Sequence, residues 1–199
     1  METKITDIRF CECKDSPYIK PKRMLFSQNG KERKWDIIEA HDSVAILLYH
    51  TQKEAFIVVK QFRPAVFLKE QTQQAQNLKI PQGYTYELCA GITDKPNKTL
   101  QEIAQEEILE ECGYQIPLQN ITKITEFYSS VGFAGSKQTL FFAQVKEEYR
   151  QNQGGGVDDE EIEVIFIPKN KAYNFILDES YPKTSGVMFA FLWFLQRNP

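Results

Sequence analysis

The amino-acid sequence predicts an α+β fold with a mixed sheet, and three observations carry this prediction. β-Branched apolar runs separated by short turns fill much of the chain, which is typical of paired strands. A strongly acidic helix with clear start and stop signals divides these runs into two groups, and an apolar helix closes the pattern. The 199 residues, 42 % of them hydrophobic, suit one globular domain with a small appended element.

The first strands are predicted as two hairpins. Asn29 and Gly30 stand between two strand-like runs over residues 23–38, and Asn-Gly is the strongest short-range signal for a hairpin turn. Residues 43–50 and 55–62 are apolar runs joined by a polar turn, so they are expected to form a second hairpin that enters the core.

The remaining elements follow from similar patterns. The polar segment 70–84 is typical of a long surface loop, and 84–90 of a single strand. Further strands and loops then alternate before a final helix, in which Trp193 is expected to lie in the core. The strands are expected at 121–129, 138–145 and 161–168, the loops at 132–137 and 151–160, and the helix at 185–197.

Residues 100–112 form the acidic helix, and its ends are well marked. Thr99 and Glu102 form a capping box at the start, while Gly113 stands where a left-handed C-terminal cap is expected. Apolar residues at helical spacing form the expected buried stripe. They are Leu100, Ile103, Ala104 and Ile108.

Glutamates crowd this helix, and Glu107, Glu110 and Glu111 converge on one face. Carboxylates four residues apart repel by about 0.2–0.5 kcal/mol per pair, and anions near the helix C-terminus also oppose its dipole. A solvated acidic face is one interpretation. The other is a hard divalent cation, Mg²⁺ or Mn²⁺, bound among the carboxylates, because such a cation would remove the repulsion.

The segment from Gly91 to Tyr114 resembles the Nudix box, G-x5-E-x7-R-E-U-x-E-E-x-G-U, in which U is bulky and apolar. The spacing after Gly91 is one residue longer than in this pattern, Lys98 falls near its early Glu, and Glu106 replaces its Arg. The resemblance implies a Mg²⁺-dependent hydrolase of nucleoside diphosphates linked to another group. The replaced Arg leaves open how the catalytic Glu is supported.

Two further segments are similar to the nucleotide-sugar diphosphatase branch of this family, namely 87–91 (ELCAG) and 60–64 (KQFRP). The resemblance implies a Nudix α/β/α sandwich with a mixed sheet. Residues 1–40 would then be an N-terminal β element and 41–199 the hydrolase domain. Members of the branch commonly form homodimers through such an element, so a homodimer is expected.

The resemblance also implies a metal site. Its ligands would be the backbone carbonyl of Ala90 and the carboxylates of Glu107, Glu110 and Glu111, with Mg²⁺ as the expected ion and Mn²⁺ as the alternative. Glu107 would also be catalytic. These residues supply only oxygen atoms, which suits a hard cation.

The general base is expected outside the box, in the acidic loop 151–160. In this position Glu160 is the first choice for taking the proton of the attacking water, because its spacing to the next strand resembles that of the branch. Glu161 and Glu163 are the alternatives. A solvated acidic turn is the non-catalytic interpretation.

Four residues are candidates for substrate binding. Arg63 suits a phosphate clamp because a guanidinium donates paired hydrogen bonds to phosphate oxygens, but an ion pair at a strand end would use the same residue. Trp35 is expected either to stack on the base across a dimer or simply to pack. Ser130 and Gly132 either line the substrate pocket through backbone groups or form a tight turn.

The leading hypothesis is hydrolysis of UDP-glucose to UMP and glucose 1-phosphate. ADP-ribose or another ADP-sugar is the rival substrate, and a non-catalytic nucleotide-binding module is the alternative class. A net charge of −3 without a basic block argues against nucleic acid as a partner. No run is long and apolar enough for a membrane span, and four cysteines without paired spacing favour reduced thiols, so a cytoplasmic protein is expected.

Overall fold

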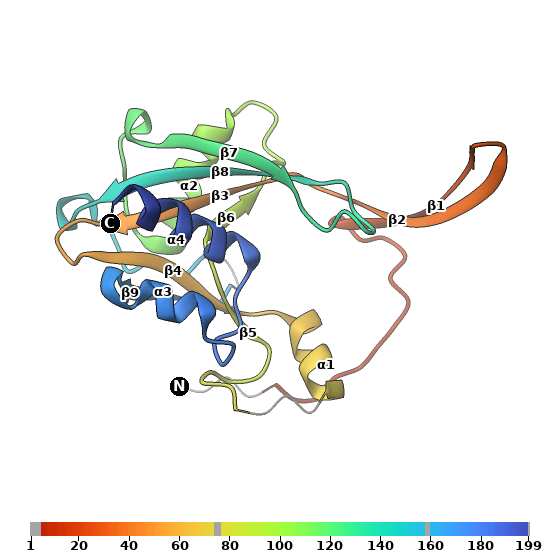
Figure 1. Cartoon of the computed structure of the whole chain (residues 1–199), viewed down its shortest axis with the longest axis horizontal. Helices are drawn as coiled ribbons and strands as arrows, with labels where there is room; N and C mark the ends of the chain where they lie inside the picture. Colours follow the sequence, from red (N-terminus) through yellow and green to blue (C-terminus); the bar gives the residue numbers. More distant parts are fainter. Residues whose placement is uncertain (1–4, 74–76, 158–159, 199) are drawn as a thin grey trace.

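A computed structural model describes residues 5–73, 77–157 and 160–198, and within them a seven-stranded mixed sheet lies between two helical layers (Figure 1). Helix α2 packs on one face, and helices α3 and α4 pack on the other. The expected α/β/α sandwich is confirmed. The strands of this sheet are β3 (Ser43–His50), β4 (Ala55–Phe62), β5 (Tyr84–Glu87), β6 (Cys89–Ile92), β7 (Thr122–Tyr128), β8 (Lys137–Val145) and β9 (Ile162–Pro168). The helices are α1 (Pro64–Gln73), α2 (Leu100–Cys112), α3 (Lys169–Leu177) and α4 (Ser185–Arg197), with short 3-10 turns η1 (Leu118–Asn120) and η2 (Glu147–Tyr149).

Strand β3 lies in the middle of the sheet and is buried on both faces. It pairs in parallel with β8 along its whole length and antiparallel with β4. Successive side chains of a strand point to opposite faces, so its apolar residues divide between the two cores. Val44, Ile46 and Leu48 pack on the α2 side, and Ala45, Leu47 and Tyr49 pack on the side of α3 and α4.

Strands β3 and β4 are paired only over Leu48–His50 and Ala55–Ile57, and residues 84–92 pair with the unpaired remainder of both. Strand β5 pairs antiparallel with Val59–Phe62 of β4, and β6 pairs antiparallel with Ser43–Ile46 of β3. The prediction of one strand over 84–90 was therefore wrong, because the chain changes its pairing partner at Leu88. This change places Glu87 opposite Val59 of β4 and Ala90 opposite Ala45 of β3.

Strands β1 (Ile19–Gln28) and β2 (Lys31–Ala40) form a separate two-stranded sheet, which projects from the body as an arm (Figure 1). The predicted Asn-Gly turn is confirmed, since Asn29 and Gly30 have φ values of 54° and 75°, as a type I′ turn requires. At the base of the arm, the N–H of Ile38 donates to the carbonyl of Phe133 at 2.7 Å.

Two helices differ from the sequence expectations. Helix α1 occupies the start of the segment 70–84 that was expected as a loop, and α3 was not predicted. Helix α1 is mostly exposed and lacks the apolar stripe on which sequence reading depends. In α2, Leu100 lies in the first turn and is exposed rather than buried, whereas Ile103, Ala104 and Ile108 are buried as predicted. Within the described ranges, no helix is both long and apolar enough to span a bilayer.

Candidate active site

Helix α2 carries the acidic residues, and both of its ends are fixed as the sequence predicted. Thr99 Oγ1 accepts the N–H of Glu102 at 3.2 Å, and the Glu102 carboxylate accepts the N–H of Thr99 at 2.7 Å. At the other end, Gly113 adopts a φ of 79°, and its N–H donates to the carbonyl of Leu109 at 3.0 Å. These caps set the rotation and length of the helix, and therefore the direction of its glutamates.

Glu111 is the most buried carboxylate of α2, with 5 % of the residue exposed. Its Oε2 accepts the backbone N–H of Ala90 at 3.0 Å, which joins α2 to β6. Burial raises the pKa of Glu111 to about 8, although the Ala90 N–H and the Cys89 thiol act in the opposite direction. A buried carboxylate of this kind is stabilised in its ionised form by a bound cation.

Glu107 lies next to the backbone of β6. Its carboxylate is so close to Gly91 that a Cβ at this position would collide with it, which explains the need for glycine here. Burial and repulsion from Glu110 raise the pKa of Glu107 to about 7, while Lys95 lowers it. Ala90, Glu107 and Glu111 therefore meet at one place between β6 and α2.

Glu106, next to Glu107 in α2, is paired with two lysines. Lys95 donates to its Oε2 at 2.9 Å, and Lys98 binds its Oε1. Both lysines lie in the turn that precedes α2, so Glu106 fastens that turn to the helix. Glu106, at the Arg position of the box, is therefore neutralised by two lysines close in sequence. The box has an Arg at this position and an early Glu near Lys98, so the two charges are exchanged in this chain.

Arg63 forms a two-pronged ion pair with Glu87, in which its Nε and Nη2 each donate at 2.8 Å to one carboxylate oxygen. The Glu87 side chain is 11 % exposed and also accepts the hydroxyl of Thr85 at 2.6 Å. The carboxylates of Glu87, Glu111 and Glu160 together raise the pKa of Arg63, so its guanidinium lies within electrostatic range of the α2 cluster. Sequence reading missed Glu87 as a partner, although a carboxylate in a buried strand was an available signal.

Glu160 comes from the loop that follows η2. Its charge raises the pKa of both Glu107 and Glu111, which places it near the metal-ligand candidates. Its Oε2 accepts the N–H of Val157 at 3.2 Å, within a turn closed by its own N–H and the Val157 carbonyl at 3.1 Å. Asp158 and Asp159 of the expected acidic loop lie outside the described residues.

Trp35, Ser130 and Gly132 come together as a second group, at the base of the β1–β2 arm. The indole Nε1–H of Trp35 donates to the carbonyl of Gly132 at 2.9 Å, and 55 % of Trp35 is exposed. Ser130 has a φ of 53°, and its carbonyl accepts the N–H of Ala134 at 2.8 Å, so these residues do form a tight turn. Within the described residues, no hydrogen bond or ion pair joins this group to the glutamates of α2.

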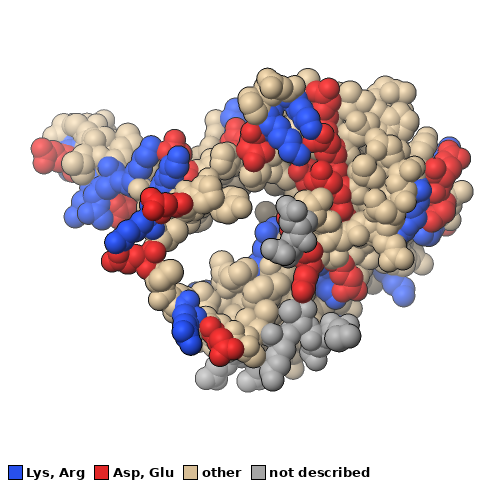
Figure 2. Space-filling view, turned by 180° about the vertical axis from the view of Figure 1, so that it is seen from behind, with Lys and Arg blue, Asp and Glu red and all other residues tan. Residues whose placement is uncertain are grey.

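The side chains of Glu107, Glu110 and Glu111 and the Ala90 carbonyl offer the oxygen donors that a hard divalent cation prefers. Glu107 is partly buried and Glu111 is buried, the charge of Glu107 raises the pKa of Glu111, and every candidate donor is an oxygen. Across residues 5–73, 77–157 and 160–198, no three His, Cys, Asp or Glu side chains are gathered closely enough to hold a cation as they stand. Figure 2, seen from the α2 side, shows acidic and basic side chains close together rather than a surface of one sign.

Comparison with known proteins gives the family. No family model matches the chain. The chain is 38 % identical to uridine diphosphate glucose pyrophosphatase NUDT14 of Bos taurus, over 96 % of this chain and 94 % of the relative. It is 36 % identical to the Mus musculus protein of the same name, over 93 % and 91 % of the two chains. It is 31 % identical to GDP-mannose pyrophosphatase of Escherichia coli (strain K12), over 72 % and 68 %.

The two uridine diphosphate glucose pyrophosphatases cover nearly the whole chain. The residues that carry the box resemblance lie together between β6 and α2 in an α/β/α sandwich. The chain is therefore a member of the Nudix hydrolases, in the branch of nucleotide-sugar diphosphatases.

Proposed function

We propose that this protein hydrolyses the diphosphate of UDP-glucose to UMP and glucose 1-phosphate, at the site between β6 and α2. The observation that carries the proposal is the arrangement of a partly buried carboxylate, Glu107, and a buried one, Glu111, within electrostatic range of Glu160, with Arg63 in range of Glu111 and Glu160. This arrangement combines acceptors for a cation, a cationic group for phosphate and a candidate base.

Glu107, Glu110, Glu111 and the Ala90 carbonyl are the residues that would hold the metal, with Mg²⁺ preferred and Mn²⁺ as the alternative. When bound, the cation neutralises charge on the phosphoryl oxygens and lowers the pKa of bound water. The protein contributes the position of these oxygens, because the Ala90 N–H holds the Glu111 carboxylate against β6. Gly91 contributes by leaving space for the Glu107 carboxylate.

Arg63 is proposed as the phosphate clamp. Its Nε and Nη2 are held by Glu87, so the Nη1 hydrogens lie on the other edge of the planar guanidinium and can donate to a phosphate oxygen. The ion pair and the clamp are therefore compatible roles of one side chain. The pairing also fixes the guanidinium before the substrate arrives, which lowers the entropic cost of binding.

Glu160 is proposed as the general base that takes the proton of the attacking water, with Glu161 and Glu163 as alternatives. Its closeness to Glu107 and Glu111 supports this role, because the water that attacks phosphorus must be deprotonated beside the proposed metal ligands. Glu163 on β9 forms an ion pair with Lys60 on β4, which makes Glu163 the weaker alternative.

We propose that the protein is a homodimer that pairs through the β1–β2 arm. A free two-stranded hairpin is at best marginally stable in water, yet nearly all side chains of this arm are exposed, including Met24, Leu25 and Trp35. A second copy would bury them. In this arrangement Trp35, Ser130 and Gly132 are proposed to contact the substrate, with Trp35 stacking on its base.

The four cysteines are free thiols, two of them exposed, which supports the cytoplasm as the compartment that we propose.

The competing substrate is ADP-ribose, and GDP-mannose is added because one group of relatives is named for it. Measuring kcat/KM for the three substrates with Mg²⁺ tests the proposal. The proposal requires UDP-glucose to have the highest value, and a higher value for either of the others would assign the site to that substrate.

A further inference from the structure

The loop that carries Glu160 is hydrogen-bonded to the backbone of α2 at the residues proposed as metal ligands. The N–H of Gly155 donates to the Glu111 carbonyl at 3.0 Å, and the N–H of Gly156 donates to the Glu110 carbonyl at 3.1 Å. The last carbonyls of a helix have no partner within the helix. The loop supplies these partners, and it brings positive N–H dipoles to the end of α2 where the carboxylates crowd.

Two glycines allow this close contact between loop and helix. A Cβ at Gly154 would collide with the carbonyl oxygen of Glu111, and a Cβ at Gly113 would collide with the carbonyl oxygen of Asn152. Gly154 also has a φ of 71°, which L side chains rarely adopt. The backbones of loop and helix therefore touch only because both positions lack a side chain.

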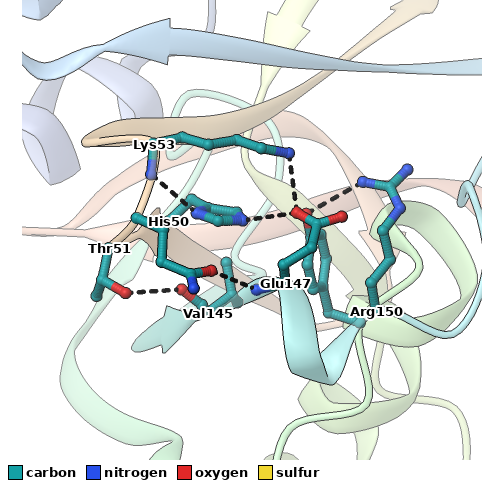
Figure 3. A network of polar contacts seen from close by, with 8 residues as sticks. His50, Thr51, Lys53, Val145, Glu147 and Arg150 are labelled. Carbon is teal, nitrogen blue, oxygen red and sulfur yellow. Dashed lines mark hydrogen bonds and ion pairs between the residues drawn. The ribbon is translucent and has the colours of Figure 1, made fainter.

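The upstream end of the loop is anchored by a network at η2 (Figure 3). The N–H of Lys53 donates to His50 Nδ1 at 3.2 Å, so the ring proton is on Nε2, which donates to Glu147 at 3.2 Å. Lys53 Nζ pairs with the same carboxylate at 3.0 Å, and Arg150 donates to the Tyr114 hydroxyl at 3.1 Å. The loop therefore starts from a fixed point.

The downstream end is fixed by the same glycines. The N–H of Ile162, the first residue of β9, donates to the Gly155 carbonyl at 3.3 Å. A Cβ at Gly156 would lie 2.7 Å from both Cβ and Oε2 of Glu160. The position of the Glu160 side chain is thus set by the glycines that contact α2.

We infer that Gly154–Gly156 is a positioning element that ties the candidate base Glu160 to the peptide carbonyls of Glu110 and Glu111. This inference rests on the proposed function. Glu110 and Glu111 then have two roles. Their side chains would bind the cation, and their backbone carbonyls hold the loop that carries Glu160. Catalysis depends on such placement, since a displacement of about 1 Å can reduce a rate about 100-fold.

The test compares Gly154→Ala with Gly186→Ala, a control on α4 where an added methyl meets its nearest neighbour at an ordinary 3.5 Å. Gly154→Ala should lower kcat by about tenfold or more, while Mn²⁺ affinity, measured by electron paramagnetic resonance, stays within about twofold. In a Glu160→Gln background the same change should cause no further loss of kcat, because Gly154 acts through Glu160. Gly186→Ala should leave kcat, Mn²⁺ affinity and the kcat of the Glu160→Gln variant unchanged. If Gly154→Ala does not fold, Gly156→Ala replaces it.

Amide hydrogen exchange separates this inference from the proposed function, because it needs no turnover. Wild-type protein should protect the amides of Gly155 and Gly156, and Gly154→Ala should speed their exchange about tenfold or more. Unprotected amides in the wild type would overturn the inference even if nucleotide sugars are hydrolysed. A kcat loss that is undiminished in the Glu160→Gln background would also overturn it. Protected amides without hydrolysis of any nucleotide sugar would support the attachment of the loop to α2 and refute the proposed function.

Discussion

The backbone N–H of Ala90 donates to Oε2 of Glu111 at 3.0 Å, and this one contact joins β6 to α2 in the middle of the site. It holds a carboxylate with 5 % exposure in place without neutralising it. The single N–H lowers the pKa of Glu111, but burial has the larger effect and leaves the pKa at about 8. A bound cation would stabilise the ionised form of this buried carboxylate.

Stability without metal should depend on pH in a direction that Glu111 sets. Its pKa is about 8 in the folded protein against an ordinary 4.5, so the folded state binds more protons between these values. The contribution of Glu111 to the free energy of unfolding should therefore be fully present below about pH 4.5 and should be lost as pH rises toward 8. Urea unfolding at about pH 5, 6.5 and 8 in EDTA measures this slope.

Glu111→Gln is the control for that measurement. The variant lacks the titrating carboxylate, so its free energy of unfolding should fall less steeply with pH than that of the wild type. Saturating Mg²⁺ should also flatten the wild-type slope, because a bound cation stabilises the ionised form. Equal slopes for wild type and Glu111→Gln in EDTA would show that Glu111 does not titrate in this range.

Charge reversal tests the pairing of Glu106 with the lysines. Glu106→Lys should weaken Mn²⁺ binding several-fold, because it repels Lys95 and Lys98 and adds a cation beside Glu107. The combined change Lys98→Glu with Glu106→Lys restores an opposite pair and the local net charge, so affinity should recover. Stability should change by at most about 1 kcal/mol, since the pair is partly exposed. A double variant no better than Glu106→Lys would refute the pairing as the cause.

The sequence was sufficient to predict most of the fold, including the helix that carries the glutamates. Capping residues and periodic apolar patterns are local signals, so α2, the two hairpins and the later strands could be read directly. The change of strand partner at Leu88 could not be predicted, because it depends on long-range strand pairing. Helix α1 could not be predicted either, because its apolar stripe is weak.

The site was harder to predict where residues distant in sequence meet. Arg63 was recognised, but its partner Glu87 lies on another strand, and only the register of β4 and β5 brings them together. The hydrogen bonds from the glycines to the carbonyls of Glu110 and Glu111 also depend on tertiary packing. The roles given to Trp35, Ser130 and Gly132 stay predictions, since they depend on a second copy.

Substitutions at the Arg63–Glu87 pair should affect substrate binding more than the metal site. Arg63→Lys keeps the charge but loses the planar fork, so kcat/KM should fall about 10- to 100-fold with unchanged Mn²⁺ affinity. Glu87→Gln should raise KM, because the guanidinium is no longer held before substrate binds. Steady-state kinetics and Mn²⁺ titration measure both. Unchanged KM in both variants would remove Arg63 from the binding site.

The β1–β2 arm should set the oligomeric state. Met24 lies opposite Trp35 in the hairpin register, and Met24→Glu places a charge on this apolar pair. Light scattering coupled to size-exclusion chromatography should give twice the chain mass of 23.1 kDa for the wild type and a lower mass for Met24→Glu. Lys31→Glu, beside the turn, is a matched charge change that should remain dimeric. A monomeric wild type would contradict the proposed dimer.

The central claim is metal-dependent hydrolysis of a nucleotide-sugar diphosphate at the glutamates of α2. Phosphorus-31 NMR of UDP-glucose with Mg²⁺ follows it most directly, with wild type and Glu111→Gln measured side by side. With the wild type, the diphosphate signals of UDP-glucose should disappear and those of UMP and glucose 1-phosphate should appear. Glu111→Gln or EDTA should abolish this conversion. An intact UDP-glucose spectrum with folded, Mg²⁺-saturated wild type, or equal conversion by Glu111→Gln, would contradict the central claim.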